Sequence, residues 1–339
     1  MNGIKVSVIV PTYNRLFELQ SFVKSLEQAV GDHDVEILIV DDGSSDGTKE
    51  YFKKYKSQLD IKLLHQENTG PGAARNLGMT HSKGDYFLFI DSDCTVPQDY
   101  FTRIKKALSD HQYDAFGGPD TYREDFSPLL KAINYSMTSF IGTGGTRGSK
   151  KSVTKFYPRS FNMGISRKVY ETIGEMGGLR HGQDMDYSAR IYKAGFKVGL
   201  IEKAYVYHKR RTSLWKFFKQ IFNWGVARIN LSRLHPELLK PIHLAPAMLI
   251  VTLLSIFGLS IAFGWMREFL LLSAVAFGLL ASIVMIQSLS WYKSISTSLL
   301  SIVTITIQIL AYGLGLLYAL IQIAIGKREA KGFVKHYYK

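Results

Sequence analysis

Residues 86–93 read YFLFIDSD, and this stretch decides the fold. The apolar run 86–90 predicts a strand buried on both faces, as in a parallel sheet covered by helices. Asp91, Ser92 and Asp93 follow it at the carboxyl end of the strand, the edge where open α/β sheets bind ligands. Two carboxylates two residues apart can reach one hard cation, and oxygen ligands favour Mg²⁺ or Mn²⁺.

Short apolar runs and amphipathic segments alternate on both sides of this stretch, over residues 1–118. Strands are predicted at 6–10, 36–40, 61–64, 86–90 and 115–116, with helices at 15–30, 46–55, 71–80 and 98–109. This order predicts an α/β fold with a doubly wound, mostly parallel sheet. Further along, we expect strands at 161–166 and 204–207 and a helix at 183–194.

Polar side chains also follow the first two predicted strands. Residues 11–15, PTYNR, end the first strand, and Tyr13 there can stack on a base. Residues 41–48, DDGSSDGT, end the second strand. Asp42 can accept hydrogen bonds from uracil or from ribose hydroxyls, whereas Ser45 or Asp46 can cap the next helix.

A third polar segment, residues 70–76 with the sequence GPGAARN, opens the helix predicted at 71–80. Its small residues allow close approach of the backbone, and Arg75 can reach a nucleotide. The polar ends of three strands and the start of one helix therefore predict one ligand site.

Five motifs in this order resemble those of family 2 glycosyltransferases. They are VIVPTYN at 8–14, DDGSSDGT at 41–48, the glycine-flanked segment 72–78, DSD at 91–93 and QDMD at 183–186. The resemblance covers about residues 4–210. It implies a GT-A fold, which is a Rossmann-like nucleotide-sugar-binding sheet, with Mn²⁺ or Mg²⁺ as the cofactor and inversion at the transferred sugar. Membrane-anchored enzymes of bacterial type are the members that this chain resembles.

The resemblance also assigns roles to residues of this chain. It gives nucleotide-sugar binding to Pro11, Thr12, Tyr13, Asp42, Arg75, Asp91 and Ser92, and metal binding to Asp93, Asp91 and His208. Asp184 stands at the catalytic base, where it would take the proton of an acceptor hydroxyl. Gln183 replaces the Glu that usually precedes this base. A catalytically degenerate domain that serves as a membrane scaffold or binding module is therefore the alternative function.

Processive synthases of the family carry the motif QxxRW. Residues 220–224 read QIFNW, with Asn223 at the arginine position, and this departure predicts a non-processive enzyme. The segment after the first strand lacks the glycine pattern of a NAD-binding site. The pattern of a P-loop and the activating loop of a nucleotidyltransferase are also missing.

Charge is distributed unevenly along the chain. The net charge of +14 would suit nucleic acid, an anionic membrane or a phosphorylated ligand, but no nucleic-acid-binding module is recognisable. Between residues 244 and 326 only Arg267, Glu268 and Lys293 are charged. The single cysteine excludes a disulfide framework. We therefore expect a catalytic domain at 1–208, followed by a membrane-associated part.

The membrane-associated part has three predicted segments. Residues 209–242 carry basic and aromatic side chains, as in an amphipathic helix on an anionic bilayer. Residues 243–326 contain charge-free stretches at 244–266, 269–292 and 294–326, enough for two to three spans of a core about 30 Å thick. The basic tail 327–339 indicates the cytosolic side.

The positive charge of the tail conflicts with three membrane spans. The chain starts without a signal peptide, so the catalytic domain is expected in the cytosol at the inner membrane. A cytosolic tail then needs an even number of spans. Either the third stretch, interrupted by Gly313 and Gly315, is re-entrant or interfacial, or the charge rule fails here.

The acceptor is expected at the membrane. An anchor beside a basic, aromatic segment indicates a lipid-linked or glycan acceptor that offers a hydroxyl or a phosphate at the cytoplasmic face. The glycine-rich stretch 142–159 can grip an acceptor phosphate or close over the donor through its basic side chains. These are Arg147, Lys150, Lys151, Lys155 and Arg159.

Overall fold

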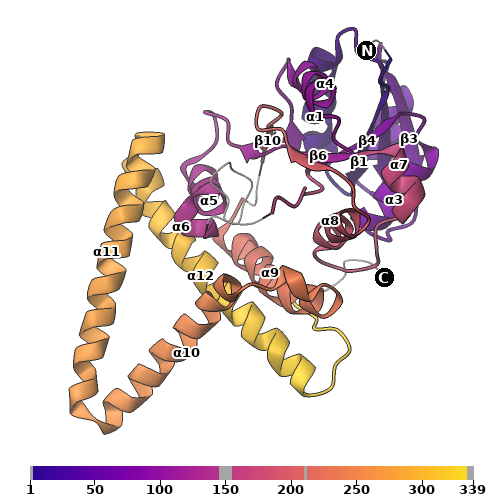
Figure 1. Cartoon of the computed structure of the whole chain (residues 1–339). Coiled ribbons are helices and arrows are strands. Elements are labelled where there is room, and N and C mark those ends of the chain that lie inside the picture. The colour runs from indigo at the N-terminus through magenta and orange to yellow at the C-terminus, as the bar shows by residue number, and fades with distance from the viewer. Residues whose placement is uncertain (1–2, 145–154, 210–211, 334–339) are drawn as a thin grey trace. The chain divides into compact units, whose positions relative to one another are not determined.

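The computed structural model describes residues 3–144, 155–209 and 212–333, and these form two compact units (Figure 1). The first unit comprises residues 3–121 and 155–209, and the second comprises residues 122–144 and 212–333.

A seven-stranded sheet of order β3-β2-β1-β4-β8-β6-β9 organises the first unit. Its strands are β1 (Val6–Thr12), β2 (Val35–Asp41), β3 (Asp60–His65), β4 (Tyr86–Ile90), β6 (Ala115–Gly117), β8 (Asn162–Ser166) and β9 (Val198–Leu200). Strands β3, β2, β1 and β4 pair in parallel, as do β6 and β9, whereas β8 is antiparallel to both neighbours. The expected mostly parallel α/β sheet is confirmed.

Helices cover both faces of this sheet because successive strand residues point to opposite sides. The helices are α1 (Leu16–Val30), α2 (Thr48–Lys54), α3 (Pro71–His81), α4 (Tyr100–His111), α7 (Arg167–Ile173) and α8 (Gln183–Lys193). Val8 packs with Phe22 of α1 and Ile104 of α4. The next residue, Ile9, packs instead with Tyr187 of α8 in a cluster that also contains residues of α3 and α7.

A small second sheet lies at the functional end of the first unit. Its strands are β5 (Cys94–Thr95), β10 (Val206–His208) and β7 (Asp120–Thr121), in the order β5-β10-β7. The sequence predicted that His208 follows a strand over 204–207. It is instead the last residue of β10, because its pairing with Cys94 extends the strand.

The second unit is helical. Its elements are α5 (Pro128–Thr138), α6 (Phe140–Thr143), α9 (Leu214–Leu234), η1 (Pro236–Leu238), α10 (Pro241–Ala262), η2 (Gly264–Met266), α11 (Arg267–Tyr292) and α12 (Ile295–Ala324). Three helical segments are long and apolar enough to cross a membrane: Pro241–Ala262, Gly264–Tyr292 and Ile295–Ala324.

The interruption expected at Gly313 and Gly315 does not occur, since α12 runs through both residues. A Cβ atom at Gly315 would lie 2.1 Å from the carbonyl oxygen of Phe222 in α9, and one at Gly313 would lie 2.7 Å from the carbonyl oxygen of Pro246 in α10. The glycines therefore serve close helix packing.

Candidate active site

Three neighbouring parallel strands deliver the predicted motifs to one edge of the sheet. β1 ends at Thr12, β2 at Asp41 and β4 at Ile90, and the register of these strands places their carboxyl ends together. The DSD segment follows β4 directly. The structure thus brings the three predicted motifs together at one edge of the sheet.

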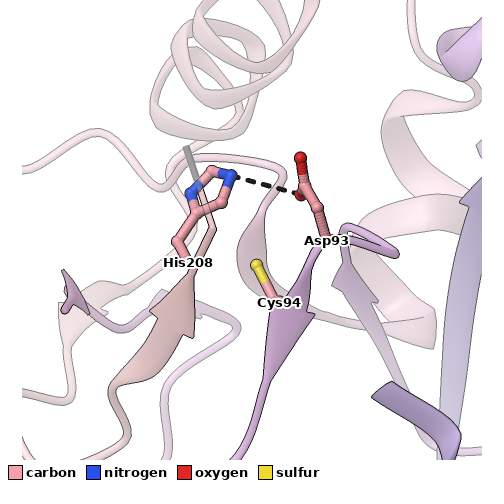
Figure 2. A group of neighbouring side chains, drawn as sticks. All are labelled: Asp93, Cys94 and His208. Carbon is pink, nitrogen blue, oxygen red and sulfur yellow. Dashed lines mark ion pairs between the residues drawn. The ribbon is translucent and has the colours of Figure 1, made fainter. Parts of the chain in front are cut away.

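Asp93 is the centre of a largely buried charged cluster, of which Figure 2 shows Asp93 and His208. Its Oδ2 atom pairs with Nη1 of Arg15, and its Oδ1 atom lies 3.2 Å from Nε2 of His208. The other ring nitrogen of His208, Nδ1, lies 3.4 Å from Oδ2 of Asp120. Because the Asp93 side chain is 8% exposed, its charge depends on these cations for compensation.

The charges of this cluster support one another. Burial lowers the pKa of His208, but the charge of Asp93 and hydrogen bonds to Asp120 and Asp93 raise it by more, to about 9. The pKa of Arg15 is also raised, above all by the charge of Asp93. At neutral pH two cationic side chains therefore face the Asp93 carboxylate.

The cluster fits a divalent cation. Ligand atoms of Asp93, Cys94 and His208 lie within 4.8 Å of one another (Figure 2). A carboxylate oxygen and a neutral imidazole nitrogen are donors that Mn²⁺ accepts. His208 would have to release its proton when a cation binds, because only the neutral ring can be a ligand. Cys94 is a softer donor, and its thiol is directed to the carbonyl oxygen of Phe161 at 3.9 Å.

Asp91 is linked to the start of α3. Its Oδ1 atom lies 2.5 Å from Nη2 of Arg75, whose Nη1 donates to the carbonyl oxygen of Pro71. Arg75 and Ser92 are buried, whereas a third of the Asp91 side chain is exposed. The ion pair thus ties the DSD segment to the helix that the sequence predicted for nucleotide contact.

Asp42 is buried and already has partners within the protein. Its Oδ1 atom accepts from Nε2 of Gln66 at 2.6 Å and from the backbone N–H of Thr69 at 2.9 Å, and its Oδ2 atom accepts from the backbone N–H of Gly70 at 2.9 Å. Asp42 therefore fixes the segment before α3, a role that sequence reasoning did not identify.

The three predicted contacts at the end of β1 differ in exposure. Pro11 and Thr12 are buried strand residues, and Tyr13, the next residue, is 49% exposed. The Oγ1 atom of Thr12 is buried and has no hydrogen-bond partner among the residues that the structure describes. The ring of Tyr13 is thus available to a ligand, and the Oγ1 atom of the neighbouring Thr12 is available as a hydrogen-bond partner.

Asp184 lies in the first turn of α8, where the helix dipole favours a negative charge. The N-cap of α8 is Gly182, so Asp184 is not the capping residue. Its Oδ1 atom accepts from the backbone N–H of Met185, and its Oδ2 atom lies 3.8 Å from Nη1 of Arg159. The side chain remains 20% exposed, as a proton acceptor for a bound ligand requires.

The Gln183 side chain connects α8 to α3. Its Nε2 atom donates to the carbonyl oxygen of Gly177 at 3.2 Å. A Cβ atom at Gly72 of α3 would lie 2.2 Å from that same Nε2 atom. The residue that departs from the family pattern therefore packs between the two helices that carry Arg75 and Asp184.

The basic loop and the tail are described in part. Arg147, Lys150 and Lys151 lie outside the described residues, as does the tail after Phe333. Lys155 lies over the ring of Tyr192 at 5.3 Å from the centroid, and Arg159 faces Asp184.

Sequence reasoning missed two residues of the charged cluster. Arg15 follows the quoted PTYN motif directly, so its position was a usable signal. The sequence around Asp120 contained no such signal, because Asp120 comes close to His208 only through the parallel pairing of β7 with β10.

Comparison with known proteins concerns the sequence and the fold. Residues 7–174 match the model of the family described as glycosyl transferase family 2. Glycosyltransferase AglE of Haloferax volcanii is 29% identical over 239 residues, which are 67% of this chain and 77% of AglE. Glycosyltransferase GlyA of Streptococcus pneumoniae is 29% identical over 203 residues, which are 59% of this chain and 25% of GlyA, so this chain matches a quarter of that relative.

A solved structure shares the fold over most of the chain. The mannosyltransferase PcManGT from Pyrobaculum calidifontis, determined in complex with GDP-Man and Mn²⁺, matches with a TM-score of 0.63. The match covers 88% of this chain and 86% of that one, at 18% identity.

Proposed function

Because the chain belongs to glycosyltransferase family 2, we propose that it is a membrane-anchored, metal-dependent and inverting enzyme. It moves one sugar from a nucleotide-sugar, for which UDP is our proposed nucleotide, to a hydroxyl or phosphate of a lipid-linked or glycan acceptor. We place the reaction at the cytoplasmic face of the inner membrane.

The cluster around Asp93 is the observation that carries this proposal. Asp93 and His208, with Asp91 two residues before Asp93, are the proposed ligands of Mn²⁺ or Mg²⁺. The bound cation supplies positive charge to the diphosphate of the donor. PcManGT, whose fold this chain shares, was solved with GDP-Man and Mn²⁺, which supports this assignment.

The proposed donor site surrounds the exposed ring of Tyr13, on which the base stacks. Thr12 offers its unused Oγ1 atom to the donor, and Asp42 keeps the segment before α3 in place. Arg75 orients Asp91 for the ribose or the cation. Pro11, a buried residue of β1, and Ser92, a buried residue of the DSD segment, complete the set.

The proposed transfer is a single displacement. The acceptor oxygen forms a bond with the anomeric carbon while the bond from that carbon to the diphosphate oxygen breaks on the opposite face, which inverts the configuration. Asp184 accepts the proton of an acceptor hydroxyl as this bond forms. A phosphate acceptor is ionised at neutral pH and would need no such base.

Transfer of a single sugar fits the surroundings of Asn223, which stands where processive relatives carry arginine. Its side chain accepts from the backbone N–H of Phe333 at 2.8 Å and donates to the Phe333 carbonyl oxygen at 3.3 Å. Asn223 therefore serves the packing of the second unit rather than a growing polymer.

The test uses the full chain purified in detergent with a panel of UDP- and GDP-sugars. With Mn²⁺, one donor should release its nucleotide slowly to water, and either chelation or Asp93→Ala should abolish this release. A preference for a GDP-sugar would revise the nucleotide but keep the enzyme. The absence of release and of metal-dependent binding for every donor would refute the proposal.

The alternative is a degenerate domain that binds a nucleotide-sugar as a membrane scaffold, and Gln183 is the observation that favours it. Such a protein would bind the donor in a metal-dependent manner without turning it over in the presence of membrane extract that supplies acceptors. Turnover under these conditions therefore separates the two functions.

A further inference from the structure

We propose that α10 and α11 are the two membrane-crossing helices of this chain. In this arrangement α12 lies in the interfacial region of the leaflet that faces the catalytic unit, together with α5 and α9. The partner of the exposed apolar side chains on these helices is the lipid bilayer. The inference concerns the insertion of the second unit and does not depend on the proposed reaction.

The helices α10 and α11 have the properties of a transmembrane hairpin. They contain 22 and 26 residues, about 33 and 39 Å of helix, and a hydrocarbon core is about 30 Å thick. The short helix η2 joins them at a tip that carries no other element in Figure 1. Their apolar windows are 17% and 6% buried, so large apolar side chains face outwards on all sides.

Helix α12 differs because its N-terminal half is bound by polar contacts to α5. Thr304 Oγ1 accepts from Ser136 Oγ at 2.6 Å and donates to the carbonyl oxygen of Ala132 at 3.1 Å. Gln308 Nε2 donates to the carbonyl oxygen of Ser136 at 3.0 Å. Its apolar window is 39% buried, more than twice the fraction of α10.

Helix α5 cannot reach the far side of a membrane. It has 11 residues, about 16 Å of helix. It belongs to the segment 122–144, which leaves the catalytic unit after Thr121 and precedes its return at residue 155. The half of α12 that packs on α5 therefore lies on the side of the catalytic unit.

The second half of α12 packs beside charged and polar groups of α9. Arg228 Nε donates to the hydroxyl of Tyr312 at 3.2 Å, and Arg228 Nη1 donates to the carbonyl oxygen of Leu238. Tyr312 lies near the middle of α12. If α12 spanned the bilayer, Arg228 would stand near its centre, at a cost of about 3 kcal/mol or more.

The chain after α12 folds back along α9. Asn230 exchanges two hydrogen bonds with the backbone of Ala330, at 2.9 and 3.0 Å, and Gln322 does the same with Lys331, at 3.0 and 3.1 Å. This returning segment contains Lys327, Arg328, Glu329 and Lys331. Its charges belong in water or among lipid headgroups, so the adjoining end of α12 lies there too.

The returning segment also ends beside the first turn of α9. The ring of Phe333 lies 5.8 Å from that of Trp215, and Lys219 Nζ lies 6.0 Å from the Phe333 centroid. Leu214 follows Lys209 by five residues, which reach about 18 Å when fully extended and cannot cross the core. The end of the described chain is therefore on the side of the catalytic unit.

The outer face of α12 suits a position within one leaflet. Most of its exposed apolar side chains form a stripe of helical period that opposes the face packed on α5 and α9. The stripe consists of Leu299, Val303, Leu310, Leu314, Tyr318 and Ile321. Two spans and an immersed third helix also satisfy the even number that the basic tail requires.

Cysteine labelling tests this topology directly. Lys56→Cys reports the catalytic unit, Gly264→Cys reports the hairpin tip, and Lys327→Cys reports the returning segment. Each is treated with a membrane-impermeant maleimide in right-side-out and in inverted vesicles. The unmodified chain is the control, because its single cysteine, Cys94, is buried.

Our proposal predicts that Lys327→Cys is labelled in the same vesicles as Lys56→Cys and that Gly264→Cys is labelled in the opposite ones, with at least tenfold contrast. Labelling of Lys327→Cys together with Gly264→Cys would show three spans and overturn the proposal. Labelling of Gly264→Cys with Lys56→Cys would show that the hairpin does not cross, which also overturns it.

Discussion

At the scale of single residues, His208 connects the proposed metal site to Asp120. One ring nitrogen faces Asp93 and the other faces Asp120. An imidazole that ligates a metal is oriented by the hydrogen bond of its second nitrogen. Asp120 is therefore a positioning residue, since it sets the orientation of His208 without being one of the proposed ligands.

Asp120→Asn should raise the Mn²⁺ concentration that gives half-maximal donor turnover by about 10- to 100-fold, because the His208 ring is no longer held in its orientation. Turnover at saturating Mn²⁺ should change much less. Asp125→Asn is the matched control, since Asp125 is exposed and pairs with Arg123. Equal Mn²⁺ requirements in the two variants would argue against this role of Asp120.

Gly72→Ala should lower turnover by a few-fold at most, because the new methyl group displaces the flexible end of the Gln183 side chain and breaks its hydrogen bond to Gly177. Donor turnover is the measurement. The double variant Gly72→Ala/Gln183→Ala removes the clash and should recover part of the activity. Gly178→Ala is the control, since no atom lies within 4 Å of that added Cβ. If the double variant instead lost as much turnover as the two single substitutions together, the contact between Gly72 and Gln183 would be contradicted.

The sequence predicted which polar residues share one edge of the sheet better than it predicted their contacts. Asp91 and Asp93 follow a strand with a clear pattern, and Arg75 lies near the start of a predicted helix, so their shared edge followed from the order of the elements. The partners of Asp42 did not, because its hydrogen bonds go to backbone groups of residues 69 and 70, which no side-chain pattern reveals.

At the scale of elements, α9 and α12 approach so closely that glycines replace side chains at the contact. A Cβ atom at Gly225 would lie 2.2 Å from the carbonyl oxygen of Tyr312, and one at Gly315 would lie 2.1 Å from that of Phe222. Backbone atoms cannot move aside as a flexible side chain can. The pair of helices thus depends on both residues.

Gly315→Ala should therefore destabilise the second unit by about 1 to 3 kcal/mol, the usual cost of overpacking. The apparent melting temperature in detergent should fall. Gly258→Ala on α10 is the matched control, because its Cβ meets nothing within 4 Å, and alanine there should be neutral or slightly stabilising. Equal melting temperatures for the two variants would contradict the close packing.

The boundaries of the predicted elements in the first unit agree with the observed ones to within two residues. The strand 86–90 was predicted with its observed ends, and the helix from 183 differs by one residue at its end. Gly313 and Gly315 were read as an interruption because glycine disfavours helices in isolation. The contacts of α12 with α9 and α10 override that preference, and they join residues about 70 to 90 positions apart.

At the scale of the whole molecule, charge and apolar surface are segregated. Outside residues 244–326 lie 67 of the 70 charged residues, and the apolar helices occur within that stretch. In our proposal the basic segment 209–242 and the apolar helices α10 and α11 are two separate means of membrane attachment, and they differ in their sensitivity to salt.

A wash with about 1 M salt shortens the screening length to roughly 3 Å and should remove a protein held by charge alone. We expect the chain to remain in the membrane pellet and to leave it in detergent, because α10 and α11 bury apolar surface in lipid. Sedimentation of washed membranes measures this. Extraction by salt would contradict a membrane-crossing hairpin.

The most direct test of the central claim compares two aspartates of α8. Asp184→Asn should lower donor turnover by about 10²- to 10⁴-fold, the usual contribution of a general base, while donor binding with Mn²⁺ is kept. Asp186→Asn should stay within a few-fold of the unmodified chain, because Asp186 pairs with Arg190 in the same helix. Undiminished turnover in Asp184→Asn, or an equal loss in both variants, would contradict the account.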